Sequence, residues 1–415
     1  MSGICGLFNL DTSSVAEPEL RAMTAMLEKR GPERTGVWRD GPTGLGHALL
    51  ATTPELQFER QPFSHRETNC IITADVRLDN RDELLDALGL LDRRASVGDA
   101  ELILRAYLNW DEACLDRLLG DFAFAIWDPR HQKLFGARDH VGLRPFYYHH
   151  AQGQRFAFAS DARAILVLSQ VPYQVNEGRI ADFLVPQLEW IDYTSTFYEG
   201  VFRLPPGHKV TVTNSGIEVT EYWKPQHGPE LDALSEDDVA AGFLEVFGKA
   251  VKARLRAPAG SVGSMLSGGM DSGSVVAVGK DILSAGGHGP LSTFSAALRR
   301  DSDCRESRAI YASLSMPSLS PTLVHPDSQE ENFDSLISNI EEPFDAKYMI
   351  LKAIYLTAHE QEKRVVLDGA GGDVVLGHGS YVIRLLRSWR LKQAMTEIAA
   401  ESRNWGAKSS IPDML

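Results

Sequence analysis

Two glycine-rich stretches in the second half of the chain carry the residue types that bind phosphate. The first is Ser267-Gly268-Gly269-Met270-Asp271-Ser272, between an apolar strand pattern and a helix pattern. Glycines let a backbone approach phosphate closely, and N–H groups at the start of a helix hold anions. Asp271 would repel a phosphate unless a cation bridged the two, so we predict Mg²⁺ beside it. The alternative interpretation is a surface turn of small residues.

The second stretch, Asp368-Gly369-Ala370-Gly371-Gly372-Asp373, also follows an apolar strand pattern. Open α/β sheets bind ligands in loops at the carboxyl ends of their strands. Two such loops, each with an aspartate, could share one nucleotide and one Mg²⁺, and we predict Asp271 and Asp373 as the metal ligands. The alternative is that Asp373 is an ordinary residue of a glycine-rich turn.

Alternating helices and strands must position these loops. From about residue 236, apolar periodicity predicts helices over 236–255 and 272–283 and strands over 261–266, 291–298 and 364–369. This alternation is typical of an α/β domain with a parallel sheet. A further amphipathic helix is predicted over Tyr381–Ala399, with Arg384, Arg387 and Arg390 on one face.

The first half of the chain has a different pattern, with many short strands and few helices. We predict helices over 16–30 and 99–108 and strands over 69–78 and 122–127. Residues 134–149 indicate strand, turn and strand, and 155–166 indicate a strand and a helix start. A hairpin over 203–223 closes this half, and 224–235 is the predicted linker.

Composition narrows the class of protein. The chain has 415 residues, 43% of them apolar and 24% charged, which excludes global disorder. Its net charge of −14 is unfavourable for nucleic-acid binding. No apolar run is long enough for a membrane span, the N-terminus does not resemble a secretory signal, and the four cysteines lack metal-site spacing. We therefore expect a cytoplasmic protein without nucleic-acid or membrane partners.

The first loop matches that of ATP pyrophosphatases, which release AMP and pyrophosphate. Over nearly its whole length the chain resembles the asparagine synthetase family, in which a glutamine amidotransferase domain of the N-terminal-nucleophile type precedes an ATP-pyrophosphatase synthetase domain. Besides the two loops, the matching pieces are Gly3–Gly6, Arg30–Pro32, Asp99–Glu101, Gly120–Ala125, Ala137–Asp139, Phe158–Ser160, Pro205–Gly207 and Tyr222–Trp223.

The resemblance implies the fold and the nucleotide site. Residues 1–223 are expected to form an α+β sandwich, followed by the linker 224–235 and by an α/β domain with a parallel sheet over 236–415. The residues expected to hold ATP are Leu266, Ser267, Gly268, Gly269, Asp271, Ser272, Phe294, Ser295 and Gly369.

The glutamine site departs from the family pattern. Glutaminase members carry a nucleophilic cysteine where this chain has Ser2, and an arginine that pairs with the glutamine carboxylate where it has Leu49. Their oxyanion residues are replaced in Asp75-Val76-Arg77. Asp99 is left as a ligand for the glutamine amine. Cys5 lies inside a strand pattern and is interpreted as a core residue. These changes predict that glutaminase activity has been lost.

The second loop departs as well, because aspartate-using members carry glutamates where this chain has Ala370 and Val374. The chain keeps the residues expected to bind the nucleotide but changes those expected to bind the acid substrate. This pattern is similar to that of β-lactam synthetases and lasso-peptide cyclases, which use an amine of the substrate itself. The favoured function is therefore an AMP-forming macrolactam synthetase that requires ATP and Mg²⁺. Its substrate is a small molecule or peptide with a carboxylate and an amine, and its implied partners are a precursor peptide and a protease.

Two alternatives stay open. One is an asparagine synthase that uses glutamine or ammonia, and the other is a non-catalytic scaffold that binds a peptide or nucleotide. The family's catalytic lysine follows the second loop, but Lys392 and Lys408 are poorly placed for it, so the chain is expected to be truncated or shortened there. Glu341 and Glu342 are either a base near the amine or an exposed acidic turn.

Overall fold

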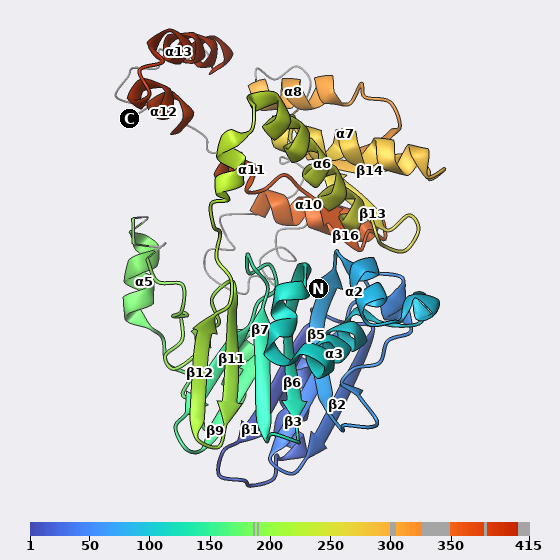
Figure 1. Cartoon of the computed structure of the whole chain (residues 1–415), viewed down its shortest axis with the longest axis vertical. Coiled ribbons are helices and arrows are strands. Elements are labelled where there is room, and N and C mark those ends of the chain that lie inside the picture. Colours follow the sequence, from blue (N-terminus) through green and yellow to red (C-terminus); the bar gives the residue numbers. More distant parts are fainter. Residues whose placement is uncertain (186, 189–190, 299–303, 326–348, 377–379, 406–415) are drawn as a thin grey trace. The chain divides into compact units, whose positions relative to one another are not determined.

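The computed structural model describes residues 1–185, 187–188, 191–298, 304–325, 349–376 and 380–405 (Figure 1). The chain divides into two compact units, Met1–Ser261 and Val262–Leu415. Within the described residues, no helix combines the length and the apolarity that crossing a bilayer requires.

Two six-stranded antiparallel sheets form the centre of unit 1, in the orders β10-β8-β9-β1-β3-β2 and β12-β11-β7-β6-β5-β4 (Figure 1). The strands of the first sheet are β1 Gly3–Asn9, β2 Arg34–Asp40, β3 Thr43–Leu49, β8 Tyr147–Ala151, β9 Arg155–Ala159 and β10 Phe202–Arg203. Those of the second are β4 Phe63–Ser64, β5 Ile71–Leu78, β6 Gly120–Asp128, β7 Lys133–Arg138, β11 His208–Thr213 and β12 Gly216–Glu221.

Three apolar clusters arrange unit 1 in four layers. Leu20 of α1 and Ile165 of α4 pack against the outer face of the first sheet. Phe8 and Trp127 pack between the two sheets, and Leu104 of α3 lies in the cluster that covers the second sheet. Burying both faces of two sheets in this way gives the predicted α+β sandwich. The helices of unit 1 are α1 Glu17–Met26, α2 Arg81–Ala87, α3 Asp99–Trp110, α4 Ala162–Leu166, α5 Glu177–Leu184 and α6 Glu236–Arg254.

A four-stranded parallel sheet forms the centre of unit 2, in the order β15-β14-β13-β16. This confirms the parallel sheet predicted from the alternation of helices and strands. The strands are β13 Val262–Met265, β14 Leu291–Ala296, β15 Leu319–Val324 and β16 Val365–Leu367. The helices are α7 Met270–Ala285, α8 Arg305–Ser313, α10 Met349–Glu360, α11 Gly372–Leu376, α12 Ser380–Arg387 and α13 Leu391–Trp405.

The single helix predicted over Tyr381–Ala399 is wrong. The chain turns between α12 and α13, where Trp389 has a φ of +58°. Val382 and Leu385 of α12 then pack with Ala394 of α13, so each short amphipathic helix buries its apolar side against the other. Arg387, at the end of α12, and Arg390, in the turn after it, therefore do not share one continuous helical face.

Candidate functional site

The first loop connects β13 to α7 as the sequence predicts. Gly268 has a φ of +78°, and a Cβ there would lie 2.6 Å from the backbone nitrogen of Ile310, so both conformation and space require glycine. The Ser267 and Ser272 hydroxyls lie 2.9 Å apart, and the Ser267 N–H donates to Ser272 Oγ at 3.1 Å. The loop therefore turns sharply into the first turn of a 16-residue helix.

The second loop lies directly against the first, because β13 and β16 are neighbouring parallel strands. A Cβ on Gly369 would lie 2.5 Å from the Ser272 nitrogen, and one on Gly372 would lie 2.4 Å from Asp271 Oδ2. The glycines thus allow the second loop's backbone to cover the Asp271 carboxylate. Sequence reasoning missed Tyr355 of α10, whose pKa is raised by burial and then by the charge of Asp368 at the start of this loop.

The residues predicted to border the adenosine lie together at the ends of β13 and β14. The Leu266 N–H donates to the Phe294 carbonyl at 3.0 Å, and Ser295 Oγ donates to the Leu266 carbonyl at 2.6 Å. The Phe294 side chain is fully buried and packs with Met265 and Val324. A contact from Phe294 to a nucleotide would therefore have to come from its backbone.

The described residues offer Mg²⁺ an incomplete but suitable site. Among the described side chains, no three His, Cys, Asp or Glu residues come together as a metal cluster. Mg²⁺ is usually held by one or two carboxylates together with phosphate oxygens and waters, and the Asp271 carboxylate at the contact of the two loops fits this pattern. The Asp373 side chain lies outside the described residues, as do Glu341, Glu342 and Lys408.

Ser2, the predicted relic of the nucleophile, is buried in unit 1. Its Oγ accepts the Leu50 N–H at 3.1 Å and donates to the Leu50 carbonyl at 3.3 Å. Cys5 is fully buried and lies 3.4 Å from Thr24 Oγ1, and burial raises the pKa of its thiol to about 12. The interpretation of Cys5 as a core residue is confirmed, since an unionised thiol is a poor nucleophile.

The positions that differ from glutaminases have their own partners here. Leu49 is buried in an apolar cluster with Ala51 and Leu56. Asp75 Oδ2 lies 3.7 Å from Arg144 Nη1 and has no hydrogen-bond partner. Burial lowers the pKa of the neighbouring His47 to about 4, so this imidazole is neutral at pH 7.

Asp99 is fully enclosed by cations that the sequence did not indicate. Its Oδ1 accepts from Arg81 Nη1 at 2.6 Å, and its Oδ2 accepts from Arg256 Nη2 at 2.7 Å and from the Leu78 N–H at 2.9 Å. The Asp99 side chain has no exposed surface. The residue predicted to bind a glutamine amine is therefore paired with arginines of the chain itself.

Glu59 is a buried acid close to Asp99. Gln61 Nε2 donates to Glu59 Oε1 at 2.8 Å, while the Gln61 amide also pairs with the backbone of Ala74. Burial, and then the charge of Asp99, raise the pKa of Glu59 to about 8. Glu59 is therefore protonated in the folded protein at neutral pH.

We expect Glu59→Gln to stabilise unit 1 by about 3 kcal/mol at pH 7. The folded pKa lies above the ordinary value of 4.5, so the wild type loses stability as pH rises from about 4.5 to about 8, whereas the variant has no proton to lose. Urea unfolding of both proteins at several pH values measures the difference. Exposed Glu67→Gln is the control, and a Glu59→Gln difference that does not change with pH would contradict the assignment.

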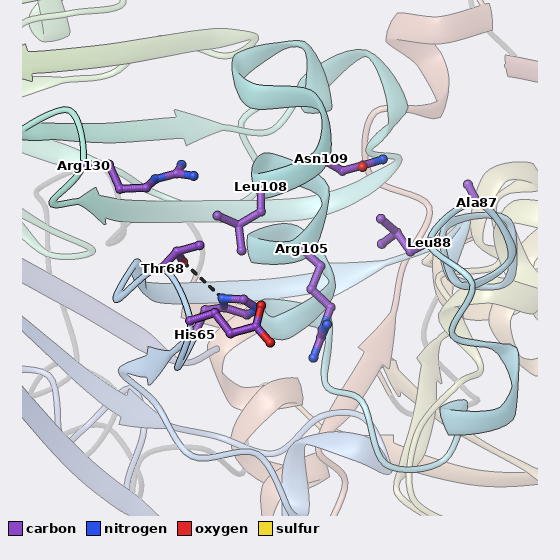
Figure 2. A pocket seen from close by; sticks show the side chains of 9 residues that line it. His65, Thr68, Ala87, Leu88, Arg105, Leu108, Asn109 and Arg130 are labelled. Carbon is purple, nitrogen blue, oxygen red and sulfur yellow. Dashed lines mark hydrogen bonds between the residues drawn. The ribbon is translucent and has the colours of Figure 1, made fainter.

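A pocket of about 360 Å³ lies elsewhere in unit 1, between α2, α3 and the turn around Thr68 (Figure 2). Two arginines line it, but Arg105 pairs with Glu101 at 2.7 Å and Arg130 pairs with Asp128 at 2.7 Å. None of the predicted site residues lines this pocket, so it is separate from the site.

Comparison with known proteins also divides the chain into two regions. A family model described as a glutamine amidotransferase domain matches residues 1–223, and one described as asparagine synthase matches residues 242–412. Asparagine synthetase (glutamine-hydrolyzing) 3 of Bacillus subtilis is 31% identical over 301 residues, which are 71% of this chain and 48% of that protein.

Two further relatives match more of the chain. Asparagine synthetase (glutamine-hydrolyzing) 1 of Bacillus subtilis is 27% identical over 91% of this chain and 58% of its own length. The amidase chyE of Penicillium rubens is 27% identical over 88% of this chain and 55% of its own length. The chain thus spans about half the length of these curated relatives. Because the amidotransferase model covers more than half of the chain and the asparagine synthase model covers most of the rest, the chain belongs to the asparagine synthetase family.

Proposed function

We propose that this protein forms an amide bond with ATP, through an acyl adenylate and with release of AMP. The contact between the two glycine-rich loops carries the proposal, because it places Asp271 and the serine hydroxyls at the carboxyl ends of two neighbouring parallel strands. This is where open α/β sheets bind nucleotides.

In the proposed reaction, a substrate carboxylate oxygen attacks the α-phosphorus of ATP, and the bond to the β-phosphate breaks to release pyrophosphate. An amine then attacks the acyl carbon, AMP leaves with the electrons of the C–O bond, and the amine gives up a proton. Ser267, Ser272 and the glycines of the first loop would hold the pyrophosphate. Asp271, with Asp373, would hold Mg²⁺, which offsets the negative charge that develops on the leaving group.

We propose further that the amine belongs to the substrate and does not come from glutamine. Ser2 is bound to the Leu50 backbone, Leu49 cannot pair with a carboxylate, and Asp99 is enclosed by arginines. A macrolactam synthetase of the lasso-peptide type, which works in the cytoplasm with a precursor peptide and a protease, is the member that we favour.

An asparagine synthetase is the second candidate, and the names of the relatives favour it. A scaffold without turnover would share the fold. Exchange of pyrophosphate into ATP separates the three functions, because it reports adenylate formation with whichever acid is supplied. Exchange with a peptide carboxylate supports the macrolactam synthetase, exchange with aspartate supports the asparagine synthetase, and no exchange with any acid supports the scaffold.

We expect aspartate to support exchange at least a hundredfold less well than a peptide that offers a side-chain carboxylate. Ala370 and Val374 are exposed apolar residues that cannot accept hydrogen bonds from the ammonium group of aspartate. When the bound substrate covers these side chains and excludes water, an amine left unpaired against them costs a few kcal/mol. The measurement is exchange of pyrophosphate into ATP with each acid in turn, for the wild type and for the matched variant Ala370→Glu/Val374→Glu. Aspartate-dependent exchange with asparagine formed from ammonia would contradict the macrolactam assignment.

A further inference from the structure

Four arginines and four carboxylates of unit 1 form two largely buried sets of ion pairs around residues 253–256. Arg254 contacts Asp79 at 2.6 Å and Asp121 at 2.8 Å, and Arg256 contacts Glu55 at 2.7 Å and Asp99 at 2.7 Å. The remaining members are Arg77, which contacts Asp79 and Asp121 and donates to the Ala253 carbonyl, and Arg81, which contacts Asp99.

Both terminal nitrogens of the Arg256 guanidinium donate hydrogen bonds to buried acceptors. Nη1 faces Glu55, while Nη2 donates to both Asp99 and the Leu78 carbonyl, the latter at 3.0 Å. A planar guanidinium can satisfy such a divided set of acceptors at once, whereas the compact ammonium of lysine cannot. Arg81 and the Leu78 N–H take two further acceptor positions of Asp99, and its side chain has no exposed surface through which an amine could reach it.

We propose that Arg256 is a permanent internal ligand of Asp99, and that the amidotransferase-like unit uses this carboxylate to hold its own segment 253–256 instead of an amino acid. The proposal rests on the proposed loss of glutaminase activity. Residues 253–256 lie in the region that matches asparagine synthase, which begins at residue 242. The carboxylates that hold them lie in the region that matches the amidotransferase domain, residues 1–223. Because the charges are largely buried, removing one partner leaves the others uncompensated.

The test is hydrogen exchange of the backbone amides of residues 253–256 in the whole chain, measured by mass spectrometry. Arg256→Ala should speed this exchange at least tenfold, and Arg256→Lys should speed it by an intermediate factor. Lys249→Ala is the matched control, because Lys249 lies on the same helix in an exposed pair with Glu245 and should change the exchange less than twofold.

Chemical rescue distinguishes a ligand from a general contribution to folding. Methylguanidinium at about 10 mM should slow exchange in Arg256→Ala at least threefold by refilling the vacated position, whereas tetramethylammonium at equal concentration should not. Exchange within twofold of the wild type in Arg256→Ala, or equal effects of the two cations, would overturn the proposal. No substrate is used, so this result is independent of adenylate formation, and glutamate release from glutamine by the wild type separately tests the lost glutaminase.

Discussion

Replacing Asp271 by alanine is expected to weaken binding of Mg-ATP at least a hundredfold while changing the stability of the fold little. The Asp271 carboxylate lies against the backbone of the second loop, so its loss should remove the proposed metal ligand and leave the apolar core intact. A hundredfold change corresponds to about 2.7 kcal/mol of binding free energy.

Calorimetric titration with ATP, in the presence and absence of Mg²⁺, measures this effect. Asp281→Ala is the matched control, because Asp281 lies on the same helix with an exposed side chain in a pair with Lys280. Asp271→Asn tests the charge alone, since it keeps the shape of the side chain. Equal affinities of Asp271→Ala and wild type for Mg-ATP would remove Asp271 from the metal site.

Glutamine hydrolysis is expected to run at least a hundredfold below the ~1 s⁻¹ at which ordinary enzymes work, and Ser2→Cys alone should not restore it. A thiol would supply a nucleophile, but Leu49 still could not hold the glutamine carboxylate. Asp99 would remain paired with Arg81 and Arg256, so the glutamine amine would have no acceptor either.

The measurement is glutamate release from glutamine by wild type, Ser2→Cys and Ser2→Cys/Leu49→Arg. All three should stay slow, because the double variant restores the nucleophile and the carboxylate partner but leaves Asp99 enclosed. Turnover near 1 s⁻¹ by the wild type would show that glutamine supplies the amine. Restored turnover in the double variant alone would show that the arginines at Asp99 do not exclude an amino acid.

The sequence by itself determined the order of elements and the position of the two loops. Apolar periodicity reports which face of a helix or strand is buried, and this property depends on neighbouring residues. The strand–loop–helix pattern around Ser267–Ser272 is therefore recovered as β13 and α7, and the pattern near 99–108 as α3. The helix over Tyr381–Ala399 failed because one amphipathic pattern also suits two shorter helices that pack together.

Only the tertiary structure decided what surrounds each functional side chain. Arg256 meets Asp99 across 157 positions of sequence, and the residues around an arginine carry no sign of the carboxylate that it will contact. The same holds for Phe294, whose ring enters the core, and for Tyr355 of α10, whose pKa is raised in part by the charge of Asp368. Sequence types show which residues could do chemistry, but whether a carboxylate remains free to bind a substrate depends on partners that the folded chain brings to it.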